Sequence, residues 1–341
     1  MMRIPVAWCA VLALAAGCTA TMPEPPPGPA ANVGQRSASG DATASTVAGT
    51  SSATSTPGSS LLATGVVLAV KIDNTGPARP RVGLDAADIV YVETVEAGLT
   101  RLLAIFSSTK PPEVGPIRSA RESDATLLAN YGRVAFAYSG ASTITATAIA
   151  GGSQVNVSMD AGALGYRRDR SRPAPYNVMG DPAALIARAG GSVSAGDIGF
   201  RVGPVAPGSR PATSVSTAYS SARIGFTWDA AVGRYLMTTD GKPEVTAAGV
   251  RVGAATVVVQ IVRTHLSANR DVNGVATPVL DVVGSGAVQV LRDGQLSTGR
   301  WSRSSATSPT ELTTSTGGQI TVAPGPLFVL LVPEGQSVTV P

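Results

Sequence analysis

The chain has 341 residues, a formal net charge of +4 and 26 basic residues, only three of which are lysines. The positive charge is spread along the sequence, and this distribution argues against a nucleic-acid partner. Both cysteines, Cys9 and Cys18, lie near the start, so the rest of the chain has no disulfide, thiolate nucleophile or cysteine metal ligand. With His265 as the only histidine, the sequence predicts neither a metal site nor a cofactor.

The first 17 residues have the three-part layout of a bacterial secretory leader. Met1-Met2-Arg3 is a short charged start, Ile4 to Leu14 is an apolar run too short to span a bilayer, and Ala15-Ala16-Gly17 places small residues before Cys18. This order indicates a lipobox, in which Cys18 is acylated and residues 1–17 are removed. We therefore expect a lipid anchor in the cell membrane, with the protein on the extracytoplasmic face.

The segment after Cys18 is dominated by Pro, Ser, Thr, Ala and Gly and has almost no large apolar side chains. Such a segment cannot bury enough surface to offset the entropy of ordering itself. We therefore expect a disordered tether over residues 18–60. A flexible chain of this length has a root-mean-square span of roughly 35 Å, which would hold a folded part clear of the membrane.

Residues 61–203 mix strand and helix signals, which indicates an N-terminal mixed α/β domain. Three apolar, β-branched runs predict strands, and the tight turn at Ala97-Gly98 predicts that the last two form a hairpin. These runs are Val66–Val70, Ile89–Val95 and Arg101–Phe106. Glu93 and Arg101 then lie on adjacent strands within about one residue of register, where they can form an ion pair.

Three helices are predicted in the same domain. The first runs from Ser119, an N-cap residue with Glu122 completing a capping box, to about Tyr131. The second covers residues 143–150. The third begins at Asp181-Pro182, because aspartate is a good cap and proline suits the first turn.

Gly and Pro cluster in residues 204–214, which predicts a linker between two domains. Over residues 215–341 helix signals nearly vanish, and short apolar runs alternate with Gly and Asp turns. This pattern predicts a mainly antiparallel, β-rich C-terminal domain. The fold class expected for the chain is therefore α+β, with a mixed α/β domain followed by an antiparallel β domain.

Several short motifs follow one another in a distinctive order. In the first half they are Val70-Lys71-Ile72-Asp73-Asn74, Ala78-Arg79-Pro80, Ala87-Asp88-Ile89-Val90-Tyr91, Glu96-Ala97-Gly98-Leu99-Thr100-Arg101 and Gly115-Pro116-Ile117-Arg118-Ser119-Ala120-Arg121. In the second half they are Val282-Val283-Gly284-Ser285-Gly286, Trp301-Ser302-Arg303 and Ser308-Pro309-Thr310. Together the series resembles the YerB-like lipoprotein family, defined by a domain of unknown function numbered 3048. The resemblance implies an exported, lipid-anchored protein of two domains, and it implies no activity.

Polar residues gather at strand ends and in loops of the first domain, where sites are commonly built on a rigid scaffold. One of them, Glu93, lies in an apolar strand, where an unpaired carboxylate is costly to bury. The Arg118 and Arg121 guanidinium groups at a helix N-terminus suit a phosphate or carboxylate ligand, although they can also form structural ion pairs. The candidate ligand-binding residues are Asp73, Asn74, Arg79, Glu93, Arg101, Arg118 and Arg121.

Two main functional hypotheses follow. The first is a lipid-anchored envelope protein whose groove binds a cell-wall polymer component or an envelope partner protein. The second is a cell-wall hydrolase or transferase in which Asp73 and Glu93 act as acid and base on a glycosidic bond, and it requires two carboxyl groups across an open cleft. A third hypothesis, an assembly scaffold, requires an exposed apolar patch on the β domain.

Overall fold

The structure is a computed structural model, and it describes residues 62, 65–191, 196–271 and 274–341. These residues belong to one compact unit, Ala53–Pro341. The leader predicted over residues 1–17, the lipidation site Cys18 and the tether predicted over 18–60 lie outside the described residues. Among the described residues, no helix is both long enough and apolar enough to cross a membrane.

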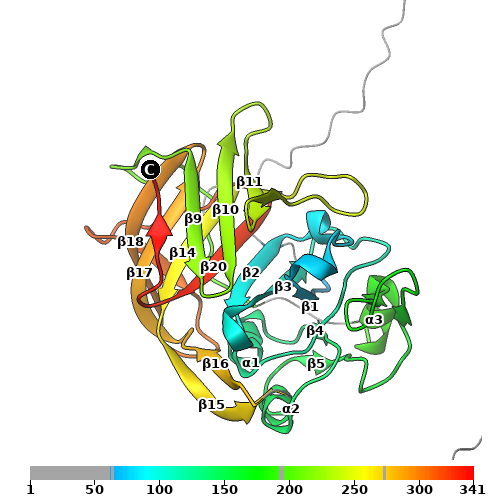
Figure 1. Cartoon of the computed structure of the whole chain (residues 1–341). Helices are drawn as coiled ribbons and strands as arrows, with labels where there is room; N and C mark the ends of the chain where they lie inside the picture. Colours follow the sequence, from blue (N-terminus) through cyan, green and yellow to red (C-terminus); the bar gives the residue numbers. More distant parts are fainter. Residues whose placement is uncertain (1–61, 63–64, 192–195, 272–273) are drawn as a thin grey trace, which may run out of the picture. The chain divides into compact units, whose positions relative to one another are not determined.

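The fold is built on one mixed sheet of eleven strands (Figure 1). From one edge to the other, ten of them are β19 Glu311–Thr314, β18 Gln295–Arg303, β17 Gly284–Arg292, β14 Thr256–Val262, β20 Leu327–Pro333, β2 Ile89–Thr94, β3 Thr100–Phe106, β1 Leu68–Asp73, β4 Ala135–Ala137 and β5 Val155–Asn156. The short β8, Arg210–Pro211, pairs with β18. The pairing of β2 with β3 is antiparallel and places Glu93 opposite Arg101, so the predicted hairpin and register are confirmed.

A second sheet of six strands contains β12 Lys242–Pro243, β11 Arg234–Thr239, β10 Ala222–Asp229, β9 Ser214–Tyr219 and β21 Val338–Thr339, with β13 Gly253–Ala254 beside β11. Its strand pairs are antiparallel. Two separate hairpins are β15 Thr264–Arg270 with β16 Ala276–Leu280, and β6 Tyr166–Arg168 with β7 Val178–Gly180. The large sheet has parallel and antiparallel pairs, and the strand pairs within the second half of the chain are antiparallel apart from β14 with β20. This arrangement confirms the predicted α+β class.

Three α-helices occur in the described residues: α1 Glu122–Leu128, α2 Thr143–Ala150 and α3 Pro182–Arg188. The Asp181 carboxylate caps α3, as predicted, by accepting the backbone N–H groups of Ala183 and Ala184. A short 3-10 turn, Ala129–Tyr131, continues α1 to the predicted end.

The predicted cap of α1 is wrong. The N-cap residue is Arg121, whose backbone N–H donates to Asp124 Oδ2 at 2.6 Å. Ser119 does not begin the helix, because both of its neighbours are held by hydrogen bonds to other segments: Arg118 N–H donates to the Lys71 carbonyl at 2.9 Å, and Ala120 N–H donates to the Gly140 carbonyl at 3.0 Å.

β20 joins the two halves of the chain within the large sheet. It pairs in parallel with β2 on one side and with β14 on the other. Six of its seven residues are buried, which explains why its sequence is a continuous apolar run without alternation. The sequence predicts this strand but not its partner β2. The division into domains 61–203 and 215–341 with a linker at 204–214 stays a prediction.

The two faces of the large sheet have different partners. On β1, Leu68, Val70 and Ile72 pack in the same cluster as the second sheet and α3. Ala69 points to the opposite face and packs in the cluster that contains α1 residues such as Leu128. Because side chains alternate along a strand, Lys71 and Asp73 also lie on the α1 face. The strand ends on that face build the site described next.

Candidate functional site

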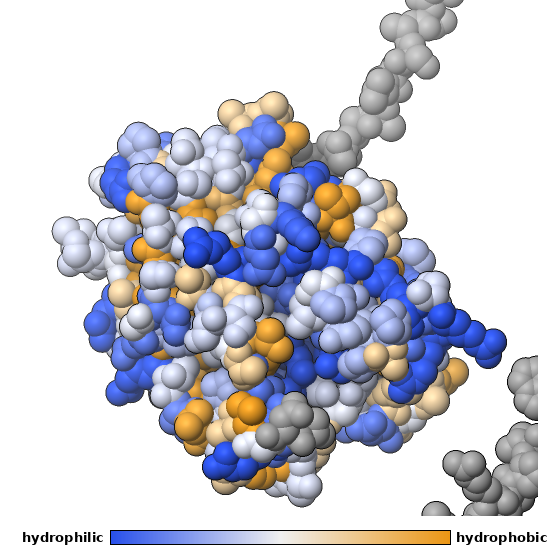
Figure 2. Space-filling model, viewed as in Figure 1, coloured by the Kyte–Doolittle hydropathy of each residue, from blue (hydrophilic) through white to orange (hydrophobic). Residues whose placement is uncertain are grey.

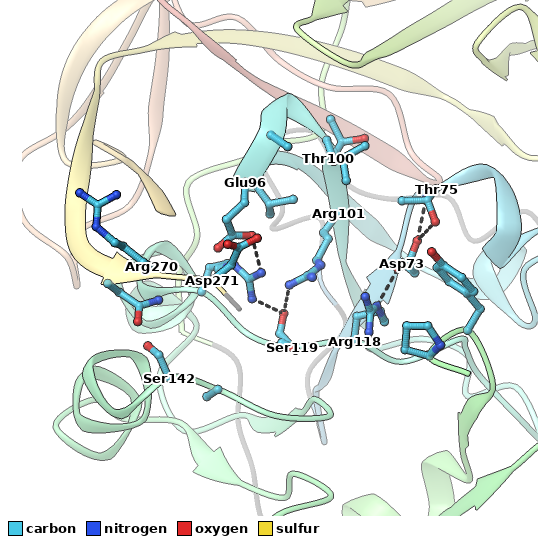
Figure 3. Close-up of a pocket in the computed structure, with 18 residues that line it drawn as sticks. Asp73, Thr75, Glu96, Thr100, Arg101, Arg118, Ser119, Ser142, Arg270 and Asp271 are labelled. Atoms are coloured by element: carbon cyan, nitrogen blue, oxygen red, sulfur yellow. Dashed lines mark hydrogen bonds and ion pairs between the residues drawn. The ribbon is translucent and has the colours of Figure 1, made fainter. Parts of the chain in front are cut away.

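A pocket of about 630 Å³ lies where β1 and β2 end and β3 begins (Figure 3). Register explains two of the charged groups there, because Asp73 of β1 lies opposite Arg101 of β3. Further lining residues come from the segment before α1, the start of α2, the β6–β7 loop and the end of β15. Those with polar or aromatic side chains are Arg118, Ser119, Arg121, Ser142, Tyr176, Asn269, Arg270 and Asp271.

At one end of the pocket, Asp73 and Arg118 form an ion pair. Arg118 Nε donates to Asp73 Oδ2 at 2.8 Å, and Asp73 Oδ1 accepts from the Thr75 N–H at 2.6 Å and from its hydroxyl at 2.5 Å. The Arg118 guanidinium also lies over the Tyr176 ring, 5.7 Å from its centre. The aspartate is therefore fully occupied with holding Arg118 and the start of the following loop in place.

A second ion pair, Glu96 with Arg121, lies on the other side of Arg101. Glu96 Oε1 also accepts a hydrogen bond from the Thr277 hydroxyl of β16 at 2.6 Å. Burial alone would raise the pKa of Glu96, but the hydrogen bond and charge of Arg121, together with the Thr277 hydrogen bond, lower that pKa below its usual value. Glu96 is therefore ionised at neutral pH, and its charge is compensated by Arg121.

Arg101 lies between these two pairs and has no carboxylate partner of its own among the described residues (Figure 3). It is only 9% exposed. Its Nη1 donates to the Ser119 carbonyl oxygen at 2.8 Å. Burial, followed by the nearby charges of Arg121 and Arg118, lowers the pKa of Arg101 to about 10, so the guanidinium still carries its charge at neutral pH. The centre of the pocket thus holds a nearly buried cation whose charge no neighbouring carboxylate neutralises.

Glu93 does not line this pocket. It is buried with Lys71 and Asp124: the Lys71 Nζ lies 2.9 Å from Glu93 Oε2 and 2.6 Å from Asp124 Oδ1. Burial first, and the Asp124 charge second, raise the pKa of Glu93 to about 8, although Lys71 opposes this rise. The predicted Glu93–Arg101 ion pair is therefore wrong, since the lysine on β1 takes the carboxylate instead.

This placement bears on the hydrolase hypothesis. Asp73 lines the pocket and Glu93 is buried behind it, so the two carboxyl groups do not face each other across an open cleft. In the part of the chain that the structure describes, no histidine, cysteine or lysine lines the pocket. Neither Ser119 nor Ser142 therefore has such a group in the pocket to activate it as a nucleophile. The arrangement favours binding of an anion over nucleophilic catalysis.

Two other predicted residues, Asn74 and Arg79, belong to a neighbouring polar network and do not line the pocket. Asn74 accepts a hydrogen bond from Arg81 Nη2 at 2.5 Å and donates to the Thr100 hydroxyl at 2.8 Å. Arg79 lies within ion-pair distance of Asp240 at 3.4 Å and of Glu244 at 3.5 Å. These contacts tie the loop after β1 to the second sheet.

Arg81 is the central residue of that network, and the sequence gives no signal for it. It is completely buried, forms an ion pair with Glu244 and donates from Nε to the Asp73 carbonyl oxygen at 2.8 Å. Arg81 thereby fixes the backbone of Asp73, whose side chain holds Arg118. It is a positioning residue for one end of the pocket.

The hairpin of β15 and β16 brings Arg270 and Asp271 to the pocket, and sequence reasoning missed both. The Ser267 hydroxyl on β15 donates to Glu122 of α1, and the Leu280 N–H on β16 donates to the Ser123 hydroxyl at 2.9 Å. These contacts join segments that are far apart in the sequence, so no local pattern predicts them.

The surface in the view of Figure 2 is mainly hydrophilic, and its hydrophobic residues are scattered in small groups. This face has no large contiguous apolar patch of the kind that an assembly scaffold requires.

The fold and the pocket define an α+β protein with a polar, arginine-lined pocket. Two family profiles match it: "Protein of unknown function (DUF3048) N-terminal domain" over residues 53–194, and the corresponding C-terminal domain over residues 215–329. The chain belongs to the YerB-like family that these two domains define. The resemblance found in the sequence motifs is thereby confirmed.

Individual relatives support the same assignment. The chain is 52% identical over 60 residues to "Putative lipoprotein YerB" of Bacillus subtilis strain 168, and this match covers 18% of this chain and 18% of that protein. A crystal structure of the YerB protein from Bacillus subtilis has the same fold, with a TM-score of 0.69 at 22% identity, covering 81% of this chain and 94% of that one. The relative's name describes a lipoprotein, in agreement with the lipid anchor predicted at Cys18.

Proposed function

We propose that this protein is a lipid-anchored envelope protein, held on the extracytoplasmic face of the membrane through Cys18, whose pocket binds an anionic component of the cell wall. The anchor is supported by the leader and lipobox pattern and by the lipoprotein name of the relative. The tether before residue 61 would let the pocket reach wall material beyond the membrane surface.

The observation that carries this proposal is that the nearly buried Arg101 guanidinium has no carboxylate partner among the described residues. Its guanidinium is 9% exposed, it lines the pocket, and its hydrogen bond goes to the neutral Ser119 carbonyl oxygen. Keeping such a charge away from water without a counter-ion costs free energy. An anion bound in the pocket would supply that counter-ion through charge-assisted hydrogen bonds, which are about twice as strong as neutral ones.

The arginines on either side of Arg101 support binding because their own side chains are held in place. Arg118 is fixed by Asp73 and lies over Tyr176, while Arg121 is fixed by Glu96. Because these contacts are made within the protein itself, binding costs little additional ordering of the two side chains.

The test uses the full chain in detergent micelles, mixed with purified, insoluble cell walls and sedimented. Arg101→Gln removes the charge at the centre of the pocket, and Arg234→Gln removes an exposed arginine on β11 as a matched control. We expect wild type and Arg234→Gln to sediment equally with the walls, and Arg101→Gln to bind at least about tenfold more weakly, which corresponds to 1.4 kcal/mol.

Equal sedimentation of both variants would contradict the proposal. The supernatant is assayed separately for released soluble fragments. Fragments that depend on the protein would support the hydrolase hypothesis instead of binding alone.

A further inference from the structure

The charge balance of the pocket indicates how many anionic groups its ligand carries. The lining holds four arginines and three carboxylates. Asp73 neutralises Arg118, Glu96 neutralises Arg121, and Arg101 is left over, while Arg270 and Asp271 are adjacent in the sequence and together add no net charge. The side chains of Asp73 and Glu96 are only 2% and 7% exposed, so their charges are fixed in the wall of the pocket. The central part of the pocket therefore presents one uncompensated positive charge.

We propose, on the basis of the function proposed above, that the ligand is held by a single terminal carboxylate at Arg101 and is otherwise a neutral, hydrogen-bonding molecule. A guanidinium is planar, and its parallel N–H groups match the two oxygens of a carboxylate. Within the described part of the chain, Arg101 makes its side-chain hydrogen bond through Nη1, to the Ser119 carbonyl oxygen, and Figure 3 shows the guanidinium in the middle of the lining residues.

A ligand with many charges fits this pocket poorly. After the first anionic group meets Arg101, each further group lies near arginines that Asp73 and Glu96 already neutralise. The two fixed carboxylates then repel additional negative charge, and this repulsion is screened less in a partly buried site than in water.

The rest of the pocket suits the neutral part of such a ligand. Thr100, Ser142 and Asn269 contribute hydroxyl and amide groups, and the Tyr176 ring beneath the Arg118 guanidinium adds apolar surface. Amide bonds of a short peptide and hydroxyl groups of an amino sugar both fit this chemistry. The shared feature is one terminal carboxylate on a neutral polar body.

Calorimetric titration of the full chain in micelles tests this proposal with four probes up to millimolar concentration. They are Nα-acetyl-dialanine, its C-terminal amide, N-acetylmuramic acid, and a poly(glycerol phosphate). The first and third carry one carboxylate on a peptide or a sugar, the second has lost that charge, and the fourth is a polyanion.

We expect one or both carboxylate probes to bind, and the one that binds identifies a peptide or a sugar as the source of the carboxylate. The amide should bind at least about tenfold more weakly than its parent acid, and Arg101→Lys should weaken acid binding because a lysine keeps the charge but lacks the planar fork. The comparison of acid with amide uses only wild-type protein, so it stands even if an Arg101 variant does not fold.

Equal binding of acid and amide overturns this inference. So does tighter binding of the polyanion with the steep salt dependence that neutralisation of several charges produces. In that last case, wall sedimentation that depends on Arg101 would leave the proposed function intact while the single-carboxylate inference fails. Absence of binding for every probe, together with wall sedimentation that does not depend on Arg101, would overturn both.

Discussion

Replacing Glu93 by glutamine tests the account of the buried charges behind the pocket. Glu93, Lys71 and Asp124 are all completely buried, so two carboxyl groups share one ammonium group. Burial and Asp124 raise the pKa of Glu93 from 4.5 to about 8, which means that Glu93 is protonated in the folded protein at neutral pH. Glutamine has the shape of that protonated form and cannot ionise.

The size of the effect follows from the two pKa values. The folded pKa is the higher one, so the contribution of Glu93 to stability is fully present below the unfolded value of 4.5 and is lost as pH rises to about 8. At 1.36 kcal/mol per pH unit, this loss is on the order of 3–5 kcal/mol. Glu93→Gln removes this loss, because glutamine does not ionise. The variant and wild type should therefore have the same free energy of unfolding near pH 4.5, and at pH 8 the variant should be more stable by about 3–5 kcal/mol.

Urea denaturation of wild type and variant across this pH range measures the difference directly. Glu334→Gln, which changes an exposed glutamate, is the matched control, and its difference from wild type should stay within about 0.5 kcal/mol at every pH. If the Glu93→Gln difference is the same at pH 4.5 and pH 8, then burial does not hold this carboxyl group neutral and the reasoning is refuted.

Three further predictions concern stability and are measured by the same denaturation assay. Arg81→Met leaves Glu244 buried without its main cation, and we expect it to lower the free energy of unfolding by about 3–5 kcal/mol. Adding Glu244→Leu should restore part of this loss. An Arg81→Met variant as stable as wild type would contradict the prediction. Asp181→Ala removes the cap of α3 and should cost about 1 kcal/mol, while Asp181→Ser should cost less; an equal loss for both would exclude a capping role. Trp301 is 1% exposed, and its indole N–H donates to the Ile261 carbonyl. Trp301→Ala removes both the packing and this donor, so we expect the free energy of unfolding to fall by about 3–5 kcal/mol. A loss below about 1 kcal/mol would be inconsistent with that packing.

Local patterns were sufficient where the structure depends on neighbours in the sequence. The turn between β2 and β3 uses Ala97 and Gly98, both with positive φ angles of 56° and 67°, and it sets the register that places Arg101 opposite Glu93. The cap of α3 at Asp181 is equally local. Four predicted residues, Asp73, Arg101, Arg118 and Arg121, line one pocket, although the pairing of β1 with β3 and the contact of Arg118 N–H with the Lys71 carbonyl join segments that are distant in the sequence.

Contacts between distant segments account for what the sequence did not reveal. Glu93 pairs with Lys71 because β1 lies beside β3 and α1 brings Asp124 over the same face. Arg270 reaches the pocket on a hairpin that hydrogen bonds to α1. Each of these partners depends on which strands and helices adjoin, and the spacing of residues along the chain carries no information about that.

The most direct test of the central claim is a crystal structure of the protein with a bound wall fragment. The account predicts an anionic group of the fragment between Arg118 and Arg121, with an oxygen about 2.7–2.9 Å from a guanidinium nitrogen of Arg101. A fragment bound elsewhere on the protein, with none of its atoms in contact with the Arg101 side chain, would contradict it.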